Sequence, residues 1–169
     1  YNSYSVEFTG FAAIESRLFF DSPLLSEQKN NNTPSIVIEP EIYHVSKDDK
    51  NVFTFRPFAR YDFDDSHRSH VDIRQLDWLY SADNFEVSAG ISKVFWGVIE
   101  SNHLVDIINQ TDVIEDVDGE DKLGQPMVQF AWLNDWGNLR LFYLPYFRER
   151  VFPSVNGRLR PSIAVESDR

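Results

Sequence analysis

The sequence predicts an all-β protein, and more narrowly an antiparallel transmembrane β-barrel. Three observations lead to this fold class. Apolar and polar residues alternate with a period of two along several segments, as in a strand with two different faces. Short and long connections alternate between these segments, as in barrels with short turns on one side and longer loops on the other. Aromatic residues make up 15% of the chain, and many of them lie near the ends of the expected strands.

The connections between the expected strands fall into two classes. Tight turns are expected at residues 46–50, 81–84 and 134–138, and long polar stretches at 21–33, 62–69, 97–125 and from 150 onward. A soluble β-sandwich has no reason to keep tight turns on one side and long loops on the other. The parity of the connections therefore favours the barrel.

Seven strands are expected, at about residues 5–20, 35–45, 52–62, 70–80, 85–96, 127–133 and 139–148. The phase of the alternation changes within the fourth, which predicts a bulge near Gln75. Seven is an odd number, whereas single-chain bacterial barrels have even numbers and leave no open edge in the hydrocarbon. We therefore expect residues 1–169 to form one transmembrane domain, incomplete at its C-terminus, that is the N-terminal part of a larger barrel with a long inserted loop at 97–126.

The two faces of these strands differ in chemistry. Apolar residues, among them Phe53, Phe55, Ala59, Val87 and Ile91, are expected to face lipid. The other face carries charges of both signs, which in a barrel would line a wet pore and in a soluble protein would meet solvent. The expected pore-lining residues are Glu7, Glu15, Arg17, Glu39, Glu41, Arg56, Arg60, Asp72, Arg74, Glu86, Arg140 and Arg148.

Composition excludes several classes of protein. The formal net charge of -11 argues against a nucleic-acid partner and against a polybasic membrane anchor. No apolar run approaches the roughly 18 residues of a transmembrane helix. The chain has no cysteine, which agrees with an envelope protein without proving one. Aromatic residues near both classes of connection match the aromatic belts of a membrane protein, although aromatic residues favour strands in general.

The connection at 97–126 is too apolar for a disordered segment. Leu104, Val105, Ile107 and Ile108 recur at helical spacing, which predicts a short helix that buries these side chains and folds into the pore. Docking of this loop on the pore wall would bring acidic residues near the strand arginines. The expected constriction residues are Asp106, Asp112 and Glu115.

A likeness to known proteins lies in Gly90 and in the segments 94–97, 106–112, 118–126 and 144–150. In these residues the chain resembles a group of largely uncharacterised porin-like outer-membrane barrels of Gram-negative bacteria. The resemblance implies an outer-membrane location and a porin or transport role, with no catalytic residues. The expected partners are outer-membrane lipid, lipopolysaccharide and small polar solutes, together with a further copy of the chain or an envelope complex.

The acidic run at 115–121 suggests a second kind of site. Asp116, Asp118 and Asp121 surround a glycine, and closely spaced carboxylates suit a hard cation such as Ca²⁺. The run lacks the acid that ends an EF-hand loop, so a solvated loop is the alternative. The sequence contains no nucleophile elbow, phosphate-binding glycine loop or dinucleotide motif, and we expect no enzymatic activity.

The leading expectation for function is a porin-like barrel that passes small polar solutes across the outer membrane. Two alternatives stay open at this point. The barrel could act mainly as a structural component of an envelope complex. The chain could also form a soluble β-sandwich that binds carbohydrate through exposed aromatic residues.

Overall fold

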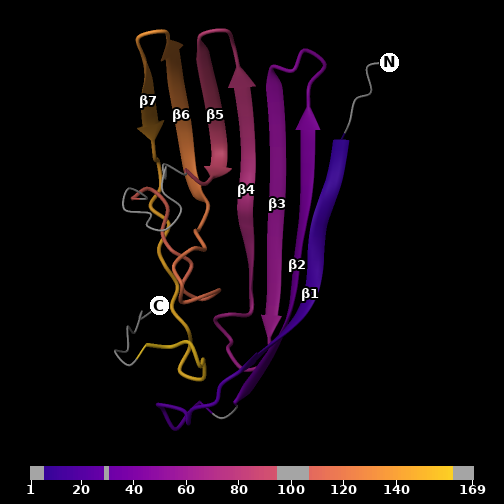
Figure 1. Cartoon of the computed structure of the whole chain (residues 1–169), viewed down its shortest axis with the longest axis vertical. Helices are drawn as coiled ribbons and strands as arrows, with labels where there is room; N and C mark the ends of the chain where they lie inside the picture. Colours follow the sequence, from indigo (N-terminus) through magenta and orange to yellow (C-terminus); the bar gives the residue numbers. More distant parts are fainter. Residues whose placement is uncertain (1–5, 29–30, 95–106, 162–169) are drawn as a thin grey trace.

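A computed structural model describes residues 6–28, 31–94 and 107–161, which form one open, antiparallel sheet (Figure 1). Its seven strands follow one another across the sheet in chain order. They are β1 (Val6–Leu18), β2 (Asn32–Val45), β3 (Asn51–Asp62), β4 (His70–Ser81), β5 (Phe85–Ser92), β6 (Gln125–Asn134) and β7 (Gly137–Tyr143). The all-β prediction is confirmed, and closure of the sheet into a barrel stays a prediction.

Two strands end earlier than the alternation predicts. The fifth strand stops at Ser92 rather than near residue 96, and the seventh stops at Tyr143 rather than at Arg148. Pro145 follows two residues after the end of β7 and has no N–H to donate to a ladder. Within the described residues no helix is long and apolar enough to cross a membrane.

The tight turns lie together at one end of the sheet, and the long connections lie at the other end (Figure 1). In the β2–β3 turn, Ser46 N donates to Asn51 O at 2.8 Å, and Asp49 has a positive φ of 55°. The Ser46 hydroxyl, followed by the Lys50 N–H, holds the pKa of the Asp48 carboxyl below its ordinary value. The prediction that tight turns lie on one side and long loops on the other is therefore confirmed.

Strand register builds one continuous apolar face. Ala12, Ile38, Ala59 and Val71 are directly paired in a row across β1 to β4. Parallel rows on β5 to β7 join Phe85, Trp132 and Leu139, then Val87, Phe130 and Leu141, then Ala89, Val128 and Tyr143. The five residues expected to face lipid, namely Phe53, Phe55, Ala59, Val87 and Ile91, all belong to this face.

The predicted bulge in β4 is confirmed. Arg56 pairs with Gln75 and the next residue, Pro57, pairs with Ile73, so Arg74 is the extra residue. The inserted residue shifts the phase by one, because side chains alternate along a strand with a period of two. As a result the Ile73 side chain stays on the apolar face, while the Arg74 side chain reaches the charged face.

Glycine permits close contact between strands at one position in particular. Gly90 has a φ of +145°, and a Cβ atom there would lie 1.9 Å from the carbonyl oxygen of Leu76. Gly137 also has a positive φ, of +152°, but a Cβ atom there would have no neighbour within 4 Å. A side chain at Gly90 would meet both backbone strain and a direct clash, whereas one at Gly137 would meet backbone strain alone.

We expect Gly90→Ala to lower the free energy of unfolding by about 3 kcal/mol, since strain and clash add. Gly137→Ala should cost about 1–2 kcal/mol, which is the cost of the positive φ alone. Denaturant titration of both variants measures the difference. Equal losses would show that β4 and β5 do not approach each other as closely as described.

Candidate functional site

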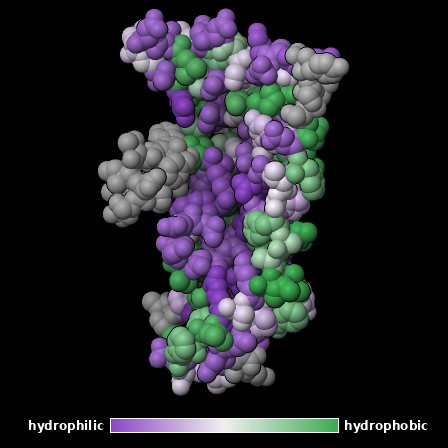
Figure 2. Space-filling model, turned by 45° about the vertical axis from the view of Figure 1, so that its right-hand side comes forward, coloured by the Kyte–Doolittle hydropathy of each residue, from purple (hydrophilic) through white to green (hydrophobic). Residues whose placement is uncertain are grey.

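A cluster of charged side chains covers the second face of the sheet. Figure 2 shows polar side chains gathered along the length of the molecule, with apolar side chains bordering them. The strand register places on this face Glu7, Glu15, Arg17, Glu39, Glu41, Arg56, Arg60, Asp72, Glu86 and Arg140. Arg74 joins them through the bulge, and Arg148 reaches them from the segment after β7. The residues predicted to line a pore therefore share one face.

The pair of Arg60 and Glu115 is central to the cluster. Arg60 lies on β3, and its Nε donates to Glu115 Oε2 at 2.9 Å, with Nη2 2.7 Å from the same oxygen. Only 6% of each side chain is exposed. The Nη1 of Arg60 donates to Ser35 Oγ at 2.8 Å and to Glu15 Oε2 at 2.6 Å. From β3, Arg60 thus links the loop carboxylate to side chains of β1 and β2.

Two further arginines bind the same loop. Arg74 donates to Asp112, and its guanidinium carbon lies 4.0 Å from the centre of the Phe58 ring. Arg17, on β1, lies 3.0 Å from the Asp116 carboxylate. Asp112 and Glu115 therefore lie against strand arginines, as expected for a loop docked on the charged face. Asp106, the third residue of the expected constriction, lies outside the described residues.

Arg68 is a member of the cluster that sequence reasoning missed. It lies in the β3–β4 connection, where a charged residue is usually solvated. Its Nη1 donates to Asp62 Oδ2 at 2.9 Å, and its Nε donates to the carbonyl oxygen of Ile114 at 3.1 Å. The side chain is 4% exposed. Its role follows from its contact with the 107–124 segment in the folded chain. No local sequence pattern predicts that contact.

The 107–124 segment has its own internal bonds. Thr111 and Lys122 form an isolated antiparallel bridge, and Asp112 N donates to Asp121 O at 2.8 Å. Asn109 is buried, and its side-chain amide donates to the carbonyl oxygens of Ser92 and Leu123. The sequence pattern did not single out Asn109, because a buried amide has no periodic signature.

The expectation for the apolar residues of this loop is partly wrong. Ile107 is 84% exposed, although it was expected to bury against the pore wall, and the side chains that do bury are Ile114 and Leu123. Ile114 lies within the turn that the Thr111–Lys122 bridge closes, and Leu123 directly follows it. Most of the expected helix, including Leu104 and Val105, lies outside the described residues.

The chain after β7 crosses the loop end of the sheet. Gln28 Nε2 donates to Gly157 O at 2.8 Å, and Ser154 N donates to Asp65 Oδ1 at 3.1 Å. Arg158 donates to Asp21 O at 2.7 Å. These bonds join the end of the described chain to the connections that follow β1 and β3. The predicted final strand ends before this segment, which instead covers the loop end of the sheet.

The acidic residues proposed as cation ligands have other partners. Asp116 pairs with Arg17, and Asp118 Oδ1 accepts from Glu120 N at 3.0 Å. Within the described ranges, no three histidine or acidic side chains are arranged to hold a metal ion. Cation binding by Asp116, Asp118 and Asp121 stays a prediction.

No family model matches the chain, and neither curated proteins nor solved structures give a match. The resemblance to porin-like barrels therefore remains an expectation from the sequence.

We expect Glu115→Gln to lower the free energy of unfolding by about 2–3 kcal/mol. Removing one partner of a buried ion pair usually costs more, but Glu15 still neutralises Arg60. The same change should expose the 107–124 segment to limited proteolysis, which can be followed by mass spectrometry. Asp118→Asn is the matched control in the same segment; its side chain is exposed, and its effect should stay within about 0.5 kcal/mol. Equal protease sensitivity of the two variants would contradict the anchoring role of Glu115.

Proposed function

We propose that the chain forms part of a porin-like barrel in the bacterial outer membrane that passes small polar solutes. One observation carries the proposal: an apolar face extends over all seven strands of the described sheet, opposite a charged face. A sheet with these two faces suits an environment with hydrocarbon on one side and water on the other.

The exposure of the apolar face supports the membrane location. Phe8 is 73% exposed, Ile14 is 84% exposed and Val71 is 83% exposed. Exposed apolar patches on soluble monomers rarely exceed a few hundred Å². Leaving this face in water would cost roughly 25 cal/mol for each Å² of apolar surface, and contact with lipid chains removes that cost.

Aromatic rings near the tight turns give independent support. The rings of Trp78 and Tyr80 lie 6.5 Å apart, those of Tyr80 and Phe85 6.0 Å, and those of Trp132 and Trp136 6.3 Å. These residues lie at the turn end of β4 to β7. Tryptophan and tyrosine favour the boundary between hydrocarbon and water, so this end of the sheet suits a membrane interface.

The charged face supports passage of polar solutes. Arginine and carboxylate side chains from β1, β3 and β4 face the docked 107–124 segment, and mixed charges of this kind attract water and ions into a pore. The segment would narrow the pore near the long loops. The dense ion pairing also favours a second candidate, a barrel whose lumen is filled and whose role is structural.

A carbohydrate-binding sandwich receives less support. Such a fold buries the apolar face of one sheet against a second sheet about 10 Å away. The part of the chain that the structure describes forms a single sheet, and its apolar face has no such cover.

Two adjacent alanines on β1 test the orientation of the faces. Ala12 lies on the apolar face, opposite Ile38, while Ala13 lies on the charged face, opposite Val37. We expect Ala12→Arg to cost about 2–4 kcal/mol for folding into lipid vesicles, and Ala13→Arg well under that. Denaturant titration in vesicles measures both. Equal costs would rule out lipid on the Ala12 side.

Excision of the docked segment tests the pore. Residues 112–121 can be replaced by two glycines, because the bridge between Thr111 and Lys122 already holds the two ends together. We expect a higher single-channel conductance in planar bilayers. We also expect the reversal potential to show a greater preference for anions, because Arg60 and Arg74 lose their loop carboxylates. The control is a variant with Asp118→Asn and Glu120→Gln, which keeps the segment in place. A silent wild-type protein would favour the structural role, and an unchanged conductance would show that the segment does not narrow the pore.

A further inference from the structure

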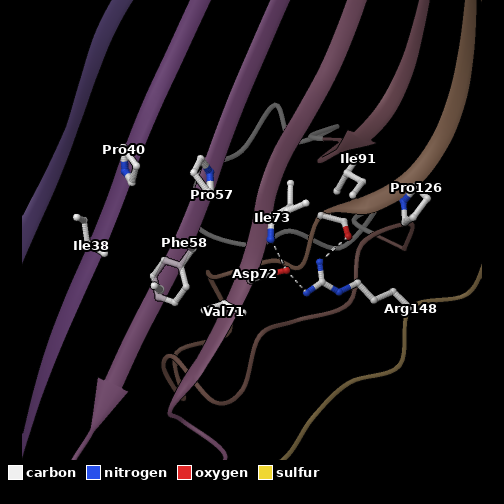
Figure 3. Close-up of a pocket in the computed structure, with 12 residues that line it drawn as sticks. Ile38, Pro40, Pro57, Phe58, Val71, Asp72, Ile73, Ile91, Pro126 and Arg148 are labelled. Carbon is white, nitrogen blue, oxygen red and sulfur yellow. Dashed lines mark hydrogen bonds and ion pairs between the residues drawn. The ribbon is translucent and has the colours of Figure 1, made fainter.

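A groove of about 630 Å³ opens on the apolar face where β5 ends (Figure 3). Its walls include Pro40 from β2, Pro57 from β3, Val71 and Ile73 from β4, and Pro126 from β6. This volume falls within the range of about 300–1,000 Å³ that is usual for small-molecule sites. No feature of the sequence predicted it, because its walls come from five strands, β2 to β6.

Three irregularities of the sheet create the groove. Pro40 and Pro57 lie where the pairing of β2 with β3 is interrupted, between Ile38–Ala59 and Ile42–Phe55, and proline cannot donate a ladder hydrogen bond. The bulge at Arg74 bends β4 beside them. The pairing of β4 with β5 stops at Leu76 and Ile91, so β5 leaves the space beside the rest of β4.

Asp72 and Arg148, which belong to the charged face, also line the groove, and their polar groups are hydrogen-bonded to each other. Asp72 Oδ1 accepts from Ile73 N at 2.7 Å and from Arg148 Nη2 at 2.6 Å. Arg148 Nη1 donates to the carbonyl oxygen of Gly124 at 3.0 Å. A sugar or an added peptide strand gains affinity by bonding to unpaired donors and acceptors. The polar side chains of this groove already bond to each other, so they offer little to such ligands. A hydrocarbon chain needs no such bonds, and the remaining walls are Gly124 and the apolar side chains of phenylalanine, proline, isoleucine, valine and alanine.

We propose that this groove holds one acyl chain of a membrane lipid. The inference rests on the proposed membrane location, since the groove opens on the face that would meet lipid. It adds a specific binding position to a face that would otherwise contact lipid uniformly. The bound chain fills the hollow beside β4, where side chains of the sheet leave a gap.

Photolabelling in vesicles tests the site. The probe is a phosphatidylethanolamine with a diazirine in one acyl chain, and the labelled peptides are mapped by mass spectrometry. We expect the labels to concentrate on residues 70–74 and 124–126. Ala59→Trp, which fills the groove, should reduce this labelling severalfold. Ala12→Trp is the matched control, because Ala12 lies in the same row of the apolar face but outside the groove.

Uniform labelling of the apolar face, or labelling that Ala59→Trp leaves unchanged, would overturn the groove as a lipid site while leaving the barrel intact. A protein that does not enter vesicles would instead contradict the proposed membrane location. The same probe in detergent micelles then tests the groove by itself, with the same two expected results. If Ala59→Trp does not fold, Ile73→Phe replaces it as the variant that fills the groove.

Discussion

Alternation of side chains along each strand is the constraint on which this structure depends. Because neighbouring strands pair in matching phase, the apolar side chains share one face of the sheet and the charged side chains gather on the other. A slip of one residue in any pair would place charges among the apolar side chains. The shared apolar face thus fixes the register, and the register assembles the charged cluster.

The charged cluster determines where the long loop lies. Burying Arg60 with Glu115, and Arg74 with Asp112, removes charges from water, and this desolvation offsets much of the attraction within each pair. Their main effect is therefore positional. An alternative placement of the loop would take the loop carboxylates from Arg60 and Arg74, which would keep only Glu15 and Asp72. Arg68 adds to this, because it joins the β3–β4 connection to the same loop through the carbonyl oxygen of Ile114.

The features that sequence predicts well are the local ones. The alternation within β3 and the change of phase within β4 are properties of a few adjacent residues, and both the faces and the bulge follow from them. The roles of Arg68 and Asn109 were not predicted. Arg68 bonds to Ile114, and Asn109 bonds to Ser92 and Leu123, so both roles depend on contacts between separate segments, which a one-dimensional pattern does not carry.

The bulge connects the two faces of the sheet. As the extra residue in β4, Arg74 keeps Ile73 on the apolar face, where it forms a wall of the groove. The same insertion sends the Arg74 side chain to the charged face, where Asp112 and the Phe58 ring hold it. Removing the extra residue would therefore disturb the groove and the anchored loop together, because one backbone irregularity positions both. The proposed lipid site and the proposed constriction lie on opposite sides of a single point in the sheet.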